Sequence, residues 1–200
     1  MQSSLFNISE NLLPSDGEVH FYPSFFSKKE SDDLMQSLLE NIAWKQEPIK
    51  IFGKEIMQPR LTAWYGEPDK SYSYSGITMN PLPWAAELLH IKTKIETISP
   101  VIYNSALLNL YRDGKDSMGW HRDNEKELGI NPVIGSVNFG ATRTFKLRNY
   151  TDKKIVKSID LTHGSFLLMQ GSTQHFWEHQ IPKTAKICEP RINITFRLIV

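Results

Sequence analysis

The stretch RINITFR (residues 191–197) has the two-residue alternation of a β-strand, which places its polar and apolar side chains on opposite faces. A buried guanidinium needs an anionic partner, so a strand that repeats arginine on one face predicts an anionic group beside that face. The polar face carries Arg191, Asn193, Thr195 and Arg197, and the apolar face carries Ile192, Ile194 and Phe196.

The residues before this stretch continue the β pattern. From residue 101 onward, short β-prone segments are separated by turn residues, which is typical of a sandwich, barrel or jelly roll. We therefore expect a jelly-roll core over residues 101–200. The segments are SALLNLYR (105–112), IGSVNFGA (134–141), RTFKLRN (143–149), GSFLLMQG (164–171) and RINITFRLIV (191–200).

The first half of the chain has helical patterns, so the expected fold class is α+β with the helices first. Ser27 and Glu30 form a capping-box pattern at the start of residues 27–44, and a second helix is expected over residues 83–98, with Pro83 near its start. Residues 45–80 read as short aromatic-rich strands, and the polar residues 1–20 are expected to be loosely held. The apolar stripes of the two helices, expected in the core, are Leu34, Leu38, Leu39 and Ile42, then Trp84, Leu88, Ile91, Ile95 and Ile98.

The composition is that of a soluble globular chain. Hydrophobic residues make up 40% of the 200 residues and charged residues 22%, which favours a single domain over residues 1–200. The one cysteine, Cys188, excludes an internal disulfide and favours a reducing compartment. The amino-terminal residues lack the pattern of a signal peptide, and no segment approaches about 18 consecutive apolar residues. We expect a cytoplasmic monomer without membrane contact, and a nuclear location is also compatible.

The net charge of +1 favours no particular partner, but basic residues gather in one segment. Such a strip could meet nucleic-acid phosphates, and a solvated hairpin explains it nearly as well. The strip carries Arg143, Lys146, Arg148, Lys153, Lys154 and Lys157 against the single acid Asp152.

The sequence WHRDN (residues 120–124) places two metal-capable side chains two positions apart. In an extended segment, His121 and Asp123 project to the same side and could share one cation. His179, twelve residues before Arg191, is the best candidate for the third ligand. Two histidines and one carboxylate form the facial arrangement of Fe(II) oxygenases, although zinc also accepts these ligands.

The arginines of residues 191–197 favour iron over zinc. A zinc hydrolase has little use for two guanidinium groups beside its metal, whereas a dicarboxylate cosubstrate such as 2-oxoglutarate needs such anchors. The Cα atoms of Arg191 and Arg197 would lie about 20 Å apart along a strand, which exceeds the length of a five-carbon diacid. Both could contact it only by leaning toward each other, so the carboxylate held by each arginine stays unassigned.

These pieces together resemble the AlkB family of Fe(II)/2-oxoglutarate dioxygenases, which dealkylate nucleic acids. The resemblance covers residues 45–200. The matching motifs are FGK (52–54), QPRLTAWYG (58–66), SYSGITM (73–79), NLY (109–111), WHRD (120–123), SVNFGATRTFKLR (136–148), HQIPK (179–183) and PRINITFR (190–197).

The resemblance implies a double-stranded β-helix with a nucleotide-recognition lid over residues 45–80. It implies Fe(II) on His121, Asp123 and His179, with 2-oxoglutarate and O2 as cosubstrates. The residues implied to line the 2-oxoglutarate pocket are Asn109, Tyr111, Arg191, Asn193 and Arg197. The residues implied to contact the nucleotide are Phe52, Arg60, Trp64, Tyr65, Tyr72, Tyr74, Ser75 and Asn124; Tyr72 would stack on the flipped base and Phe52 would act as a wedge in duplexes.

The implied reaction is oxidative demethylation of 1-methyladenine or 3-methylcytosine in DNA, and in RNA as a further substrate, with release of formaldehyde, succinate and CO2. Asn124 departs from the family pattern, because many relatives have a second acid there; the preferred lesion is thereby open. The alternatives are a dioxygenase acting on modified RNA or a protein side chain, a noncatalytic nucleic-acid-binding jelly roll, and a zinc hydrolase.

Overall fold

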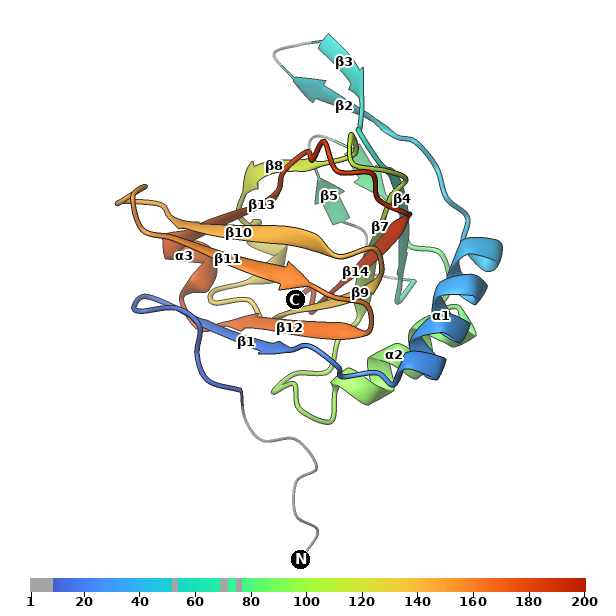
Figure 1. The fold of residues 1–200 in the computed structure, drawn as a ribbon, viewed down its shortest axis with the longest axis horizontal. Coiled ribbons are helices and arrows are strands. Elements are labelled where there is room, and N and C mark those ends of the chain that lie inside the picture. The colour runs from blue at the N-terminus through green and yellow to red at the C-terminus, as the bar shows by residue number, and fades with distance from the viewer. Residues whose placement is uncertain (1–8, 52–53, 69–71, 75–76) are drawn as a thin grey trace, which may run out of the picture.

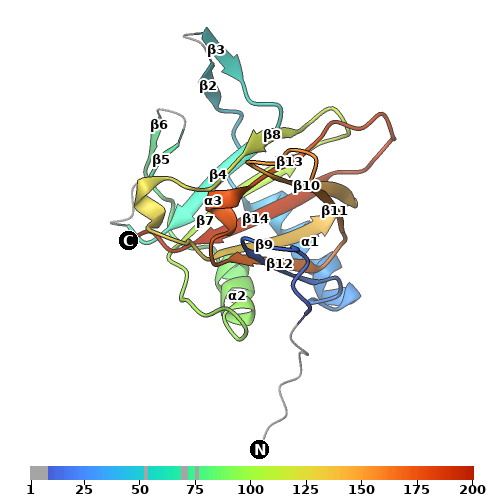
Figure 2. The same cartoon turned by 90° about the vertical axis from the view of Figure 1, so that its left-hand side faces the viewer.

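The computed structural model describes residues 9–51, 54–68, 72–74 and 77–200. Two antiparallel sheets lie face to face with helices on one side, so the predicted jelly roll with preceding helices is confirmed (Figures 1 and 2). The large sheet contains, in spatial order, β1 (Glu18–Tyr22), β12 (Ser165–Gln170), β9 (Ile134–Gly140), β14 (Arg191–Arg197), β7 (Ser105–Tyr111) and β4 (Leu61–Gly66).

The small sheet is built from the strands that carry the candidate metal ligands. It contains β11 (Val156–Leu161), β10 (Arg143–Asn149), β13 (Trp177–Ile181) and β8 (Met118–His121), in that order. Two hairpins stand apart: β2 (Pro48–Ile51) with β3 (Lys54–Met57), and β5 (Tyr72–Tyr74) with β6 (Ile77–Met79). Both hairpins lie toward the side of the molecule where β8 runs, and β2–β3 projects away from the body (Figures 1 and 2).

The helices pack against the apolar face of the large sheet. Helix α1 (Lys28–Asn41) begins with the predicted capping box between Ser27 and Glu30. Helix α2 (Ala86–Ile95) is shorter than the predicted span at both ends: it begins after Pro83, with Ala85 as its N-cap, and its C-cap is Glu96. Within the part of the chain that the structure describes, none of the helices has the length and apolarity needed to cross a bilayer.

The alternation predicted for residues 191–197 is confirmed. Ile192, Ile194 and Phe196 join the core cluster that contains the buried side chains of α1 and α2. Arg191 and Arg197 point to the opposite face, into a cavity between the two sheets. One face of the large sheet therefore packs in the core, and part of its other face lines a polar cavity. The buried helical residues of the core are Leu34, Leu38, Leu88, Ile91 and Ile95.

The expectation that residues 1–20 are loosely held is wrong for residues 9–20. Strand β1 pairs with β12, and Val19 is fully buried between the sheets. The Asn11 side chain closes the preceding turn, because its Oδ1 atom accepts the backbone N–H groups of Leu13 and Val19 at 3.1 and 2.9 Å. A turn held by one polar side chain leaves no apolar run in the sequence, which explains the error. Residues 1–8 lie outside the described residues.

Candidate active site

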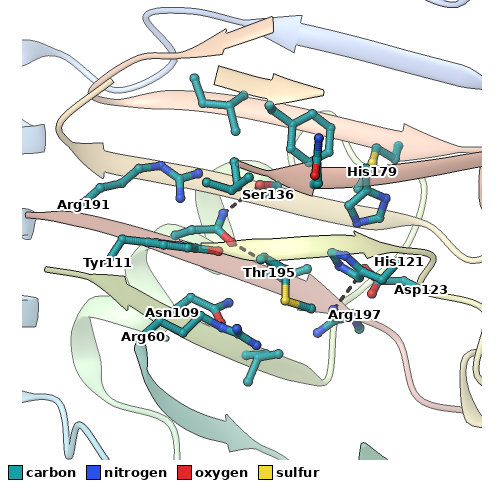
Figure 3. A pocket seen from close by; sticks show the side chains of 18 residues that line it. Arg60, Asn109, Tyr111, His121, Asp123, Ser136, His179, Arg191, Thr195 and Arg197 are labelled. Atoms are coloured by element: carbon teal, nitrogen blue, oxygen red, sulfur yellow. Dashed lines mark hydrogen bonds and ion pairs between the residues drawn. The ribbon is translucent and has the colours of Figure 1, made fainter. Parts of the chain in front are cut away.

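Two adjacent strands of the small sheet bring the predicted metal ligands together. His121 ends β8, and its cross-strand partner in β13 is His179. Asp123 follows two residues after His121, and one ligand atom from each of the three residues lies within 4.8 Å of the others. The two imidazole rings stand edge to face with centroids 4.2 Å apart (Figure 3). This grouping has the size of a single-ion site.

The unused polar atoms of these side chains fit a cation. The Nδ1 atom of His121 is 2.8 Å from the carbonyl oxygen of Gly119, so an Nδ1–H donor there leaves Nε2 free as a ligand. The Oδ2 atom of Asp123 pairs with the guanidinium of Arg197 at 3.0 Å. The Oδ1 atom of Asp123 and the Nδ1 atom of His179 are buried and have no hydrogen-bond partner among the described residues. Buried atoms of this type require a partner, and a metal ion supplies one.

The ionisation of the three side chains suits metal binding at neutral pH. Burial raises the pKa of Asp123, but the positive charges of Arg197, His179 and His121 outweigh it and lower that pKa to about 2. Burial, with the nearby charge of His121, lowers the pKa of His179 to about 3, and burial also lowers the pKa of His121. The site therefore offers one carboxylate and two neutral imidazoles without displacing protons.

The buried histidine predicts that the metal-free protein loses stability in acid. The ordinary pKa of histidine is 6.5, whereas that of folded His179 is about 3. Between these values the unfolded chain binds the extra proton, so the free energy of unfolding falls as the pH drops from about 6.5 towards about 3. We expect urea midpoints of the metal-free protein to fall across this window and those of a His179→Gln variant to fall less. An identical response of the two proteins would contradict a neutral buried imidazole.

A cavity of about 50 Å³, measured as the space open to the centres of water molecules, extends from the ligand cluster between the two sheets. His121, Asp123 and Arg197 lie at one end and Arg191 at the other (Figure 3). With neutral histidines, the charged lining is three arginines against one carboxylate, a net +2. This excess charge favours an anionic ligand. The charged lining residues are Arg60, Arg191, Arg197 and Asp123.

Arg191 is the strongest indication of that anion. Only 1% of this residue is exposed, and its Nε and Nη1 atoms have no hydrogen-bond partner among the described residues. Its Nη2 atom donates to Oδ1 of Asn138 at 2.5 Å, and its guanidinium lies 5.0 Å from the ring centre of Tyr111. Burial is the first cause that lowers the pKa of Arg191, to about 10, so the group stays charged at neutral pH. A two-point contact with a carboxylate would satisfy it.

The centre of the cavity is a polar network on the large sheet. The Nδ2 atom of Asn193 donates to Oγ of Ser136 at 2.9 Å and to Oδ1 of Asn138 at 3.2 Å, while Thr195 donates to Oδ1 of Asn193. Ser136 and Asn138 were not among the predicted site residues. The signal was available, because both occupy alternate positions of the segment SVNFG (136–140) and must share one face of its strand.

Of the predicted nucleotide contacts, one lies deep in the cavity. Arg60 is 3% exposed and donates from Nε to Oδ1 of Asn109 at 2.7 Å, so it belongs to the same polar lining as the predicted cosubstrate residues. Asn109 and Tyr111 also line the cavity, as the resemblance implies. Asn124 is exposed just beyond the predicted metal ligands.

Trp64 and Tyr65 lie in β4 and are buried away from solvent. Trp64 is 3% exposed and belongs to the core cluster between the sheets, whereas Tyr65 belongs to the cluster on the helix side and accepts a hydrogen bond from the N–H of Ala43. The side chain of Tyr65 therefore faces away from the cavity. Tyr72 and Tyr74 belong to β5, of which only the backbone is described, and Phe52 and Ser75 lie outside the described residues.

The basic strip of residues 143–157 is only partly available for phosphates. Arg143 is 4% exposed and donates to the carbonyl oxygens of Asp113, Asp116 and Pro182, so the hypothesis that it meets phosphates is wrong. The buried carbonyls of two loops take its donors instead, which the sequence does not indicate. Arg148 and Lys153 both pair with Glu178 on the outer face of the small sheet.

Comparison with known proteins agrees with this geometry. Residues 18–197 match the family model described as the 2OG-Fe(II) oxygenase superfamily, which defines the class of protein. Two solved structures are similar in fold. "The structure of OsALKBH1" has a TM-score of 0.65 at 16% identity, covering 90% of this chain and 96% of that one. A prolyl hydroxylase from Trichoplax adhaerens has a TM-score of 0.60 at 14% identity, covering 90% and 83%.

Curated relatives narrow the class. Alpha-ketoglutarate-dependent dioxygenase alkB homolog 3 of Mus musculus is 44% identical over 90% of this chain, and the match spans 66% of that protein. DNA oxidative demethylase ALKBH2 of Homo sapiens is 35% identical over 90% of this chain, and the match spans 72% of that protein. ALKBH2 of Mus musculus is 33% identical over 94% of this chain, and the match spans 83% of that protein. The chain belongs to the AlkB family. It spans just under two thirds of the length of the first of these relatives.

Proposed function

We propose that the protein is an Fe(II)- and 2-oxoglutarate-dependent dioxygenase that removes methyl groups from the ring nitrogens of DNA bases. One observation carries the proposal: a two-histidine, one-carboxylate cluster opens onto a buried cavity that ends at an unsatisfied arginine. The names of the relatives, which describe a DNA oxidative demethylase and an alpha-ketoglutarate-dependent dioxygenase, support the same reaction. The proposed substrates are 1-methyladenine and 3-methylcytosine.

His121, Asp123 and His179 would hold the iron, leaving its other coordination positions open to ligands. Bound iron would supply the oxidation: one atom of O2 enters succinate as 2-oxoglutarate loses CO2, and the other hydroxylates the N-methyl group, which leaves as formaldehyde. The protein supplies position and charge. Arg197 keeps Asp123 ionised, and the buried walls exclude bulk water from the reacting groups.

The geometry supports one orientation for 2-oxoglutarate. Arg191, at the far end of the cavity, would bind the carboxylate remote from the metal, and Arg197 already has Asp123 as its charge partner beside the ligand cluster. The keto acid end would therefore face the metal. Tyr111 lies between the two ends (Figure 3), and Asn193 also lines the cavity; both would contact the chain of the cosubstrate.

We propose that residues 45–80 form a nucleotide-recognition lid and that residues 1–200 act as one domain around a jelly-roll core at 101–200. The two hairpins β2–β3 and β5–β6 support this assignment, because they lie on the side of the molecule where β8 presents His121 (Figures 1 and 2). Tyr72 in β5 would stack on the extruded base, and Tyr74 in the same strand would help to shape its pocket. Ser75 and Asn124 would bind its polar edge.

Phe52, between β2 and β3, is proposed as a wedge that fills the gap left by the extruded base. We expect Phe52→Ala to lower kcat/KM on methylated duplex DNA about 10-fold or more, since losing one stacked base contact costs roughly 1–3 kcal/mol. Methylated single strands leave no such gap, so their demethylation should change less than about threefold. Equal losses on duplex and single-stranded substrates, measured by formaldehyde release, would exclude the wedge role.

The single Cys188 supports the proposal that the protein works in a reducing compartment, the cytoplasm or the nucleus. We also propose that the protein is a monomer. Light scattering of the purified chain tests the monomer. A mass that doubles with concentration in the working range would contradict it.

The decisive experiment measures succinate and formaldehyde from four oligonucleotide substrates: methylated single-stranded DNA, methylated duplex DNA, methylated RNA, and the unmethylated single strand as control. We expect both products in equal amounts from at least one methylated DNA and none above background from the control. Formaldehyde from RNA alone would move the substrate class to RNA. Succinate without formaldehyde from any nucleic acid would contradict the demethylase proposal.

A further inference from the structure

Gln174 contacts the backbone of a metal ligand from outside the ligand set. It lies in the short helix α3 (Thr173–Phe176), directly before β13, and its side chain is fully buried. The Oε1 atom of Gln174 accepts the backbone N–H of Asp123 at 2.9 Å. Its Nε2 atom lies 3.7 Å from the sulfur of Met169, which lines the cavity. A buried glutamine thus connects the cavity wall with the ligand segment.

The backbone of Asp123 needs such a partner because it lies beyond the sheet. Strand β8 ends at His121, where the last pair with β13 is formed. Among the described residues, Gln174 and not a strand partner takes the N–H of Asp123, which is buried. The carboxylate meanwhile is attracted by Arg197 at 3.0 Å. A free backbone at this point would let that ion pair turn the carboxylate away from the two imidazoles.

Helix α3 is itself rigidly attached to the large sheet. The Thr173 hydroxyl accepts the N–H of Glu18 at 2.9 Å and lies within hydrogen-bond distance of the carbonyl oxygens of Glu18 and Gln170. The carbonyl oxygen of His175 accepts from the guanidinium of Arg122 at 3.0 Å. Helix α3 therefore holds both residues that follow His121: its His175 carbonyl binds Arg122, and its Gln174 side chain binds the backbone of Asp123.

From these contacts we infer that Gln174 is a positioning residue for the metal centre: it fixes the peptide of Asp123 so that the free carboxylate oxygen faces His121 and His179. Arg197 holds the other carboxylate oxygen, so the side chain is constrained at both of its ends. The inference rests on the metal-binding part of the proposed function and is independent of the substrate.

Gln174→Met tests the inference, because methionine keeps the length and burial of the side chain but removes the acceptor. The readouts are Mn²⁺ affinity by titration and the visible absorption spectrum of the Co²⁺ form, which reports ligand geometry. We expect Gln174→Met to bind Mn²⁺ with an affinity at least about 10-fold lower than that of the wild type, and we expect its Co²⁺ spectrum to change. Gln174→Asn, which retains an amide but is one methylene too short to reach, should behave alike and serves if Gln174→Met does not fold.

Thr173→Val is the matched control. It lies in the same helix, is equally buried, and loses its hydrogen bonds to Glu18 and Gln170 without contacting the ligand segment. We expect Thr173→Val to lower the melting temperature while Mn²⁺ affinity stays within about twofold. The inference would be overturned if Gln174→Met had the Mn²⁺ affinity and the Co²⁺ spectrum of the wild type. It would also be overturned if Thr173→Val lost as much Mn²⁺ affinity as Gln174→Met.

The metal readouts also separate this inference from the proposed reaction. Wild-type protein that binds Mn²⁺ but demethylates no nucleic acid would contradict the proposed function and leave the role of Gln174 supported by the variants. Wild-type protein that binds neither Mn²⁺ nor Co²⁺ would overturn both.

Discussion

Asp123→Asn is expected to abolish 2-oxoglutarate turnover and to weaken Mn²⁺ binding by more than about 100-fold. Altering the hydrogen-bond partner of a metal ligand already costs about 10- to 100-fold in affinity, and this substitution neutralises a ligand itself. The carboxylate is the only acid among the charged residues that line the cavity, so no described neighbour can replace it there. Succinate formation and Mn²⁺ titration measure the two effects. Turnover above a few per cent of wild type would contradict the ligand assignment.

The same substitution should also destabilise the metal-free fold. Asp123 and Arg197 form an ion pair at 3.0 Å and are 2% and 4% exposed. Breaking a buried pair by removing one charge costs about 3–5 kcal/mol, because the other charge stays buried. The double variant Asp123→Asn/Arg197→Met should recover most of that free energy of unfolding and none of the turnover. Additive losses in the double variant would show that the pair contributes nothing to folding.

Arg191→Met is expected to weaken 2-oxoglutarate binding about 100-fold or more and, at the same time, to stabilise the ligand-free protein. The first effect follows because removing one partner of a buried charge pair costs about 2–5 kcal/mol. The second follows because two guanidinium nitrogens of Arg191 are buried without a hydrogen-bond partner among the described residues, and methionine removes that cost. Isothermal titration in the presence of Mn²⁺ measures affinity, and thermal unfolding measures stability.

Arg148→Met serves as the control for Arg191→Met. Arg148 is half-buried and pairs with Glu178 on the outer face of the small sheet, away from the cavity. The substitution Arg148→Met should leave the affinity for 2-oxoglutarate unchanged. If Arg191→Met binds 2-oxoglutarate as tightly as the wild type, the anion does not end at that arginine and the proposed orientation is wrong.

The parts of the site that were predictable from the sequence are those that follow a local period. Arg191 and Asn193 fall on one face of a strand whatever the strand pairs with, and His121 and Asp123 share a side for the same reason. The proposed third ligand, His179, was predictable because arginine-rich residues follow it. The structure places all of these around one cavity.

What the sequence did not indicate depends on contacts between distant segments. Gln174 and Asp123 are 51 residues apart, and a single glutamine carries no pattern. Arg143 looked like part of a solvated strip because its carbonyl partners come from two loops. Tyr65 lies in a strand that is buried on both faces, so alternation did not reveal which face meets the cavity. Tertiary packing decides such cases, and one sequence alone does not contain that information.

Strand β1 occupies the rim of the large sheet, with β12 on its inner side. Without it, the main-chain amides and carbonyls of β12 would be left open as a template for another molecule. Shortening the chain up to Tyr22 should therefore favour fibre-like or amorphous self-association, even though the proposed iron ligands are all far downstream. Strand β1 thus protects the edge of β12 from pairing with strands of other molecules.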